Sequence, residues 1–426
     1  MASYVIDINE NNIPHGLTEL LGSIPDRDKL NDGDVITIKF GDSFVFTSTL
    51  VLLASWRNSL PPNIHVNIDE AGSTVAVQAM ITNTGFREII ETGHERPSVH
   101  RRPNKVPLCP LTNQINKDDA VKEIASLFSN NTTGNIDKEK AFTTIIGELC
   151  ENALTHSDAT SPGYVSAGVT ENDDGKKFEI IVCDTGVGFR NSYLSGTNET
   201  VANKIKRGAS PIEIAIEGLN SSKPRVPYGG ISYYGFGLYI TRKLVEANNG
   251  HLYIISQNDC LTFNNGVPKA ITLENHFRGT LIVVILYPEN ELPLERIYQD
   301  TEKYSAPDEK NKSKDTVVNA QEDSKLKERN SRVALKDFGE ELLTREVGLA
   351  IRADIATKII SSGYIQIDLD GISDITPSVA DEAFGKLAES IGIDKFRNTV
   401  FFNGGTTLAR RLIEFVLKTR SDKSNA

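Results

Sequence analysis

Three polar side chains recur at four-residue intervals in a stretch that otherwise has the apolar pattern of a helix. The stretch is IIGELCENALTHS, residues 145–157, and the three residues are Glu148, Asn152 and His156. Successive residues of an α-helix advance by about 100°, so these side chains follow one edge of the apolar stripe. A carboxylate, an amide and an imidazole can bind polar ligands and move protons. They form either a solvated helix face or the wall of a binding site.

A second candidate is the aspartate that ends the apolar run FEIIVCD. The run predicts a strand that presents Asp184 at its end, and Gly186 and Gly188 then allow the backbone to turn. A carboxylate in a partly apolar pocket can accept a hydrogen bond from the exocyclic amine of adenine. Guanine has an oxygen at that place and is disfavoured there. A simple glycine turn explains the same residues without any ligand.

Glycines also gather before a predicted helix. The segment GGISYYGFGLYITRKL contains Gly229, Gly230, Gly235 and Gly237, and Leu238 opens the helix. Backbone N–H groups at such a helix start can bind phosphate oxygens. The glycines follow a loop and not a strand, so the context of the Rossmann dinucleotide fingerprint is missing. Farther along, Thr280 begins the apolar strand TLIVVILY, where its hydroxyl is an ordinary strand group or helps to hold a base.

Strands and helices alternate in three regions of the chain and position these residues. Residues 1–100 predict a small α/β module, and residues 116–288 predict two helices, strands, a long polar loop, a helix and further strands. The proline-containing and basic stretch at 101–115 predicts a linker, with a phosphate-binding patch as the alternative. Residues 289–332 are polar and predict a flexible linker. Residues 333–426 predict a second small α/β module, whose outline is similar to that of the first.

Composition limits the class of protein. The chain has 426 residues, 39% hydrophobic residues and a formal net charge of −11, which fits several packed domains and does not indicate nucleic-acid binding. Its four cysteines form no CxxC pair, which favours structural thiols in a reducing compartment. The N-terminal residues lack a signal-peptide pattern, and no apolar run is long enough to span a membrane. We therefore expect a cytoplasmic protein without a membrane contact.

The helix, the aspartate strand, the glycine segment and the threonine strand, in this order, resemble the GHKL ATP-binding fold. This superfamily includes gyrase, the large heat-shock chaperone, histidine-kinase ATP domains and MutL-type repair proteins. The resemblance covers residues 138–288 and implies an α/β sandwich, the Bergerat fold, that binds ATP and Mg²⁺. It implies that Asn152 coordinates Mg²⁺ and that Glu148 orients or deprotonates the attacking water.

The same resemblance assigns the remaining site residues. Asp184 would bind the adenine amine, Thr280 would support it through water, and Gly186 and Gly188 would pack against the nucleotide. Residues 190–237 would be a mobile lid whose glycines, Gly235 and Gly237, contact phosphates next to Leu238. The basic side chains that could neutralise the phosphates are Lys204, Lys206, Arg207, Lys223 and Arg225. His156 is either a supporting hydrogen-bond partner or a helix-end residue satisfied locally.

Both flanking modules resemble STAS-like domains, the small α/β fold of anti-sigma-factor antagonists. The C-terminal stretch IQIDLDGISDITPSVADEAFGKL carries this resemblance better than the N-terminal module. In that family a serine at the start of this helix can be phosphorylated, and Ser378 stands near that place. Ser378 is also a natural N-cap residue, which explains it without phosphorylation.

Several functions fit these residues. The first is an ATP-driven conformational or assembly switch with slow hydrolysis, with a protein partner bound by the STAS-like modules or by self-association. The alternatives are a protein serine kinase related to anti-sigma kinases that acts on a STAS-type partner, and a scaffold that senses ATP without hydrolysing it. A histidine kinase is disfavoured, because no helix-borne phosphoacceptor histidine with a dimerisation hairpin is visible. The single Asp-Thr-Gly at Asp184 would need a homodimer to act as an aspartic protease.

Overall fold

A computed structural model describes most of the chain. The described residues are 2–8, 15–92, 97, 102–132, 135–156, 163–172, 175–196, 198–217, 237–264, 266–294, 296–297, 331–339, 341–342, 345–372, 374–405, 409–410, 413 and 416–417. The chain divides into two compact units, of which the first is Met1–Pro224 with Tyr234–Tyr298 and the second is Arg225–Tyr233 with Gln299–Ala426.

The first unit begins with a small parallel sheet. Its strands are β1 (Ser3–Ile8), β2 (Val35–Phe40) and β3 (His65–Asp69), in the order β1-β2-β3. Buried and exposed side chains alternate along β1 and β2, so one face of the sheet is apolar and the other faces solvent. The runs YVIDI, DVITIKF and IHVNI predict strands in residues 1–100, and they coincide with β1, β2 and β3.

Four α-helices and a short 3₁₀ turn accompany this sheet. They are α1 (His15–Ser23), η1 (Arg27–Lys29), α2 (Thr47–Asn58), α3 (Val75–Thr84) and α4 (Phe86–Thr92). The sequence pattern predicts one continuous helix where α3 and α4 occur. The structure breaks it at Gly85, whose φ of 75° caps α3 in the left-handed conformation that glycine adopts readily.

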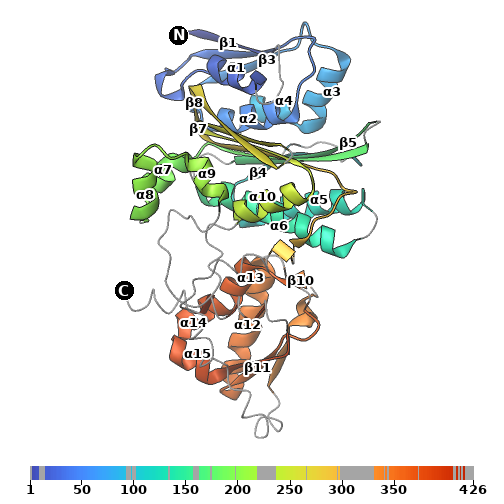
Figure 1. Ribbon diagram of the computed structural model, residues 1–426, viewed down its shortest axis with the longest axis vertical. Helices are drawn as coiled ribbons and strands as arrows, with labels where there is room; N and C mark the ends of the chain where they lie inside the picture. Colours follow the sequence, from blue (N-terminus) through green and yellow to red (C-terminus); the bar gives the residue numbers. More distant parts are fainter. Residues whose placement is uncertain are drawn as a thin grey trace. The chain divides into compact units, whose positions relative to one another are not determined.

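Helix α2 is buried almost all round. Every residue from Thr47 to Trp56 is buried, together with Asn58. Figure 1 shows α2 between the small parallel sheet and the larger central sheet. The Ser55 hydroxyl donates to the Cys183 carbonyl oxygen at 3.1 Å, and the Asn58 amide donates to the Tyr164 hydroxyl at 2.8 Å. The two sheets therefore share one hydrophobic core with α2 inside it.

The central sheet is antiparallel and has the strand order β4-β5-β6-β8-β7. Its strands are β4 (Lys105–Leu111), β5 (Gly163–Asn172), β6 (Gly175–Asp184), β7 (His251–Asn264) and β8 (Val267–Leu286). Strand β4 lies in the segment that the sequence predicts as a linker. It pairs with β5 at the edge of the sheet and has a register irregularity between Val106 and Cys109.

Both faces of the central sheet are covered. Ile181 and Cys183 belong to the core shared with α2, whereas the Phe178 ring packs against Phe142 of α6 at a centroid distance of 4.6 Å. Because side chains alternate along a strand, Asp184 faces the same side as Phe178. A strand buried on both faces has no polar alternation, which accounts for the continuous apolar runs in the sequence.

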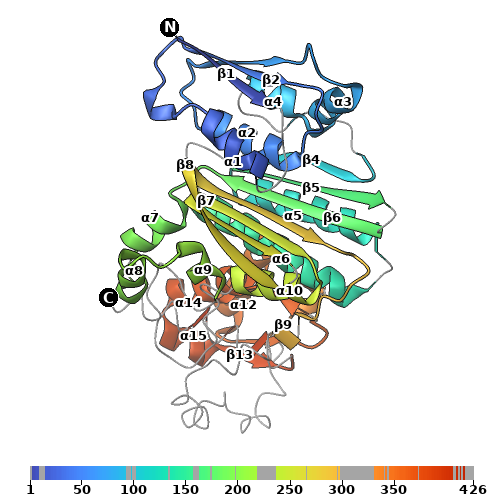
Figure 2. The same cartoon turned by 45° about the horizontal axis from the view of Figure 1, so that its top comes forward.

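Three helices cover the second face of this sheet, as the view of Figure 2 also shows. They are α5 (Gln114–Ser129), α6 (Ile136–His156) and α10 (Gly237–Ala247). Phe128 of α5 stacks on Phe142 of α6 with centroids 3.9 Å apart, and both contact Phe178 of β6. This aromatic cluster fixes α6, and with it Glu148 and Asn152, on the sheet.

Three further helices occur where the sequence predicts a long polar loop. They are α7 (Gly188–Ser195), α8 (Glu199–Lys206) and α9 (Pro211–Ile216). Tyr193, Ile205 and Ile212 are buried, and α7 and α9 pack on β7. The expected lid at 190–237 therefore begins with packed helices, and residues 218–236 lie outside the described residues.

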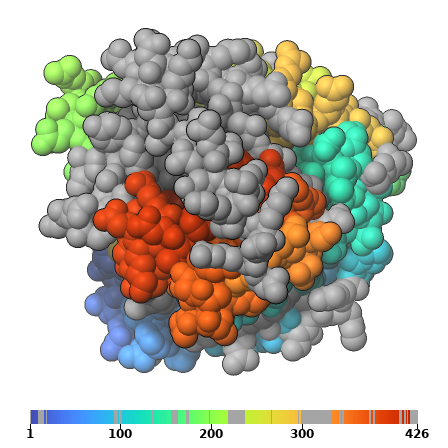
Figure 3. All heavy atoms as spheres, turned by 90° about the horizontal axis from the view of Figure 1, so that it is seen from below, coloured from blue at the N-terminus to red at the C-terminus, as the bar shows by residue number. Residues whose placement is uncertain are grey.

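The second unit is a separate small α/β structure with its own core. Its two sheets are parallel. The first has the strand order β13-β11-β9, with β9 (Arg332–Ala334), β11 (Ile365–Asp368) and β13 (Val400–Asn403). In the second, β10 (Glu341–Leu342) pairs with β12 (Asp374–Ile375). Its helices are η3 (Leu335–Phe338), α12 (Arg345–Ser362), α13 (Pro377–Ala380), the π-helical turn η4 (Asp381–Gly385), α14 (Lys386–Ile391) and α15 (Ile393–Thr399). In Figure 3 the described residues of this unit are coloured orange to red.

Helix α12 crosses the helices after β12 at Gly348, where a Cβ atom would lie 2.9 Å from Glu382 Cβ. Glu382 is 3% exposed and has three cationic neighbours. Its carboxylate lies 2.9 Å from Arg352 and 3.7 Å from Arg345, and it also pairs with Lys386. The buried charge is thus compensated at the point where the helices meet.

Candidate functional site

Asp184 ends β6 at the face covered by α5, α6 and α10. Its side chain is 5% exposed, its Oδ1 accepts the Gly186 N–H at 2.8 Å, and its strand partner is Thr280 of β8. Burial raises the pKa of Asp184 to about 7, although the backbone N–H groups of Gly186 and Thr280 lower it. The sequence thus places this carboxylate correctly at a strand end, in a poorly hydrated environment.

Ser256 of β7 connects the strand ends around this aspartate. Its hydroxyl donates to the Gly279 carbonyl at 3.0 Å, accepts the Phe189 N–H at 3.0 Å and lies 3.2 Å from the Thr280 hydroxyl. The expected supporting residue Thr280 is therefore itself held by Ser256. The sequence patterns do not predict Ser256 at this place. The signal was a hydroxyl residue at the end of the apolar strand HLYIIS.

Two glycines permit a close approach of chain segments here. Gly279 has φ 115°, and a Cβ atom on it would overlap the Asp184 carbonyl oxygen. Gly188 has φ 70°, and its Cβ would lie 2.8 Å from Gln257 Cγ. Gly188 therefore packs against β7 at the start of α7, and Gly186 donates to Asp184.

Glu148 and Asn152 lie on α6, as the apolar pattern predicts, and both are half-buried. The pKa of Glu148 is raised to about 7, mainly by burial and also by the neighbouring Glu151, while Lys117 of α5 opposes the shift. Lys117 is 5% exposed and lies 2.7 Å from Glu151 and 3.3 Å from Asp118. The sequence does not predict Lys117 beside this site.

The start of α10 lies directly against Glu148. Gly237 is the first residue of the helix, and a Cβ atom built on it would overlap the Glu148 carboxylate. Leu238 follows and is buried. Glu148 of α6 and the amino end of α10 are thereby brought together.

The other predicted site residues are exposed, have side chains that are not described, or lie outside the described residues. Lys204, Lys206 and Arg207 lie in or next to α8 and are exposed. His156 ends α6 and Ser378 lies in α13, but their side chains are not described. The residues outside the described part of the chain are Gly229, Gly230, Gly235, Lys223 and Arg225.

The donor set fits an adenine nucleotide with magnesium. Asp184 is a buried acceptor, and the amino end of the 11-residue helix α10 provides backbone N–H groups that favour phosphate. Within the described ranges no group of three or more His, Cys, Asp and Glu could hold a metal by itself. Mg²⁺ commonly uses one or two protein oxygen ligands plus substrate phosphates, and the Asn152 side-chain oxygen fits that role.

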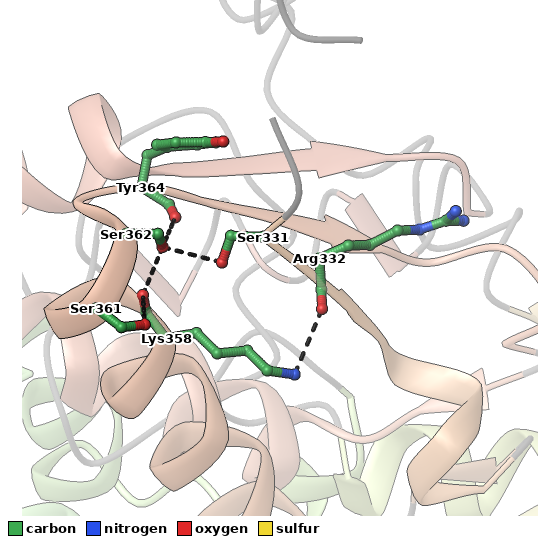
Figure 4. A pocket seen from close by; sticks show the side chains of 6 residues that line it. All are labelled: Ser331, Arg332, Lys358, Ser361, Ser362 and Tyr364. Carbon is green, nitrogen blue, oxygen red and sulfur yellow. Dashed lines mark hydrogen bonds between the residues drawn. The ribbon is translucent and has the colours of Figure 1, made fainter. Parts of the chain in front are cut away.

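The second unit contains a polar pocket at the end of α12 that differs from this site. It is lined by Ser331, Arg332, Lys358, Ser361, Ser362 and Tyr364 (Figure 4). Its groups bond to one another: Ser362 donates to Ser331 at 2.9 Å, and Lys358 pairs with Asp354 at 2.9 Å. Arg332 pairs with Asp368. Its polar groups are used internally, so we do not assign it a ligand.

The four cysteines, all within the described residues, are buried and form no disulfide. In the parts of the chain that the structure describes, no helix combines the length and the apolar character needed to cross a membrane.

Two family models match the chain. The model described as histidine kinase-, DNA gyrase B- and HSP90-like ATPase matches residues 137–286, and the model described as a STAS-like domain of unknown function matches residues 350–404. No curated protein matches the chain. The expected STAS-like character is thus found at the C-terminal end, whereas the N-terminal module is a parallel α/β layer that is not identified as STAS.

Proposed function

We propose that this chain, which has a GHKL-type ATPase domain at residues 137–286 and a STAS-like domain at 350–404, is an ATP-driven regulatory switch with slow hydrolysis. One observation carries the proposal: the Glu148 carboxylate lies against the amino end of α10, where phosphate oxygens are favoured. A potential general base and a phosphate-binding helix start thus occupy the same place.

Each residue has a distinct task in this proposal. Asp184 accepts a hydrogen bond from the adenine amine, and its environment disfavours guanine, because two acceptors would face each other. Thr280 and Ser256 support the strand end that carries Asp184. The N–H groups of α10 bind phosphate, and Asn152 is the protein ligand of Mg²⁺. The bound metal ion supplies charge neutralisation at the phosphates.

Glu148 acts as the base that orients or deprotonates the attacking water. A carboxylic acid with a pKa of about 7 is partly ionised at neutral pH and is therefore suited to proton transfer. Its low hydration and its acidic neighbour Glu151 limit the ionised fraction, which agrees with a slow reaction.

Calorimetric titration with non-hydrolysable ATP and Mg²⁺ tests the binding site. The parent chain should bind ATP well and GTP weakly, and Asp184→Asn should lose most ATP binding. The matched control is Asp28→Asn. Asp28 is an exposed acid more than 150 positions before Asp184 in the sequence, so this variant should bind ATP like the parent. Equal binding of ATP by Asp184→Asn and the parent would refute the assignment.

A hydrolysis assay tests the base. Glu148→Ala should retain nucleotide binding and lose turnover, whereas Glu139→Ala, at the first turn of the same helix, should retain both. Unchanged hydrolysis in Glu148→Ala rules out Glu148 as the base. Binding without turnover in the parent indicates instead a sensor scaffold that does not hydrolyse ATP.

The STAS-like domain on the same chain supports a second candidate, a protein serine kinase that acts on a STAS-type partner. Incubation with ATP labelled at the γ-phosphate, followed by mapping of the acceptor, separates the two functions. Labelled Ser378, or a labelled partner protein, supports the kinase. Release of inorganic phosphate without protein labelling supports the switch. Either function gives the STAS-like domain a protein-binding role, to a partner or to a second copy.

A further inference from the structure

Residues 257–259 of β7 lie just beyond Ser256, where the pairing of β7 with β8 becomes irregular. The register shifts between Ser256 and Gln257, and again between Gln257 and Asp259. Irregular strand pairing of this kind re-aims side chains and is common next to active sites. Here Gln257 and Asp259 meet the first residues of α7, immediately after the glycine loop that follows Asp184.

Asp259 forms an ion pair with Arg190. One terminal nitrogen of the Arg190 guanidinium lies 3.2 Å from one carboxylate oxygen of Asp259 and 3.0 Å from the other. Asp259 is 14% exposed and Arg190 is 37% exposed, so the pair is partly shielded from solvent. Arg190 is two residues after Gly188, and the ion pair therefore attaches the start of α7 to β7.

Gln257 of β7 makes a second contact with the start of α7, and its backbone conformation is unfavourable. Its φ of 58° is in the left-handed region, which a non-glycine residue rarely adopts. The residue is 5% exposed, its side chain lies against Gly188, and its Oε1 is buried without a hydrogen-bond partner among the described residues. Strain and an unsatisfied polar atom at one residue are typical of a functional constraint.

We infer that Arg190, Asp259 and Gln257 are positioning residues that hold the Asp184–Gly188 loop ready for the nucleotide. Fixing the loop on β7 before binding removes the cost of ordering it during binding, which raises affinity. The inference rests on the proposed nucleotide site. None of the three residues is assigned a contact with the nucleotide.

The ion pair is tested by charge exchange in the full-length chain. Arg190→Gln and Asp259→Asn should each weaken binding of non-hydrolysable Mg-ATP by roughly five- to tenfold. The double variant Arg190→Asp with Asp259→Arg restores opposite charges and should bind within about threefold of the parent. The control is Arg87→Gln, which removes a different ion pair, with Glu70, and should bind like the parent.

Gln257→Gly separates positioning from plain stability. Glycine adopts a φ of 58° without strain, so the midpoint of thermal unfolding should be unchanged or higher, while ATP affinity falls. If Gln257 had only a structural role, Gln257→Gly would lower both the unfolding midpoint and the ATP affinity, or neither of them.

The outcomes are distinguishable. If the parent binds no ATP, the proposed function is wrong and the inference falls with it. If the parent binds ATP and the single variants bind equally well, the inference alone is overturned. It is also overturned if the single variants lose affinity and the charge exchange restores none of it.

Discussion

At the scale of single residues, the GHKL-type domain contains two carboxyl groups whose pKa is raised by burial. Asp184 and Glu148 both have a pKa of about 7, and in both cases burial is the main cause. The sequence identifies both residues from their place on a strand end and a helix edge. It cannot identify Lys117, Ser256 or Asp259, because these come from other elements and reach the site only through folding.

Nucleotide affinity should depend on pH through Asp184. Above about pH 7 its carboxylate is ionised and, in the proposed function, accepts a hydrogen bond from the adenine amine. Below that pH the carboxyl group is protonated in the unbound chain. Affinity should then fall by up to about tenfold per pH unit. Calorimetry from acid to neutral pH checks this, with Asp28→Asn, which keeps Asp184 and binds ATP like the parent, as the control that should show the same fall in affinity. A parent affinity that stays constant on acidification contradicts the prediction.

If Glu148 is the base, as proposed, hydrolysis should depend on pH, because a carboxyl group acts as a base only when ionised. The rate should rise with pH and level off above about 7. Lys117 opposes the raised pKa of Glu148, so Lys117→Met should move the rise to higher pH and lower the rate at neutral pH. Lys122→Met, an exposed change on the same helix, should leave the profile in place. If the hydrolysis rates of the parent and Lys117→Met had the same pH dependence, Lys117 would not control the pKa of Glu148.

At the scale of elements, prediction from sequence succeeds where one pattern dominates. The apolar stripe of α6 and the continuous apolar runs of β6 and β8 are read correctly because burial dictates them. Strand β4 is missed because the three prolines and the basic cluster of ERPSVHRRPNKVP suggest a linker, and the last of these prolines, Pro107, lies in β4. At a sheet edge, a proline can face away from the paired strand and lose no ladder hydrogen bond.

Helices α7, α8 and α9 are missed for a different reason. Each has at most eight residues, too few to establish a helical period. Local signals were nevertheless present. Ser210 caps α9 by accepting the Glu213 N–H, and Pro211 occupies the first turn, where its missing N–H has no cost.

The charge cluster at the crossing of α12 and η4 gives a prediction on stability. Glu382→Gln would leave Arg345, Arg352 and Lys386 without their buried counter-charge and should destabilise the second unit by roughly 3 kcal/mol. Hydrogen exchange of the α12 amides measures this, since the single tryptophan, Trp56, lies in the first unit.

The matched control is Glu346→Gln, an exposed acid on α12, which should change α12 exchange little. Equal protection of α12 in Glu382→Gln and the parent would show that the cluster does not stabilise the crossing.

At the scale of the whole molecule, the N-terminal layer shares one hydrophobic core with the GHKL-type domain. Sequence analysis separates residues 1–100 from the domain, because each part has its own strand and helix pattern. Only the structure reveals that α2 has no solvent face and that the core residues of both sheets form one cluster. Sequence periodicity does not specify which surfaces meet across more than a hundred residues.

Truncation tests this shared core. Residues 1–298 should form a soluble, ATP-binding protein, because they contain both sheets and α2. Residues 102–298 should aggregate or unfold, because Ile181, Cys183, Ile255, Leu281 and Val283 would be exposed. Gel filtration and circular dichroism distinguish the two fragments. A monomeric 102–298 fragment with parental ATP affinity would contradict a shared core.

The hydrogen bond from Ser55 to the Cys183 carbonyl joins residues 128 positions apart, and this has a consequence for biosynthesis. A ribosome adds about 5–20 residues per second, so α2 emerges many seconds before β6 and β8 exist to cover it. During that interval the nascent chain exposes the side of α2 that packs on β5 and β6 in the folded protein. Translation speed and chaperone supply should therefore govern how much correctly folded protein a cell obtains.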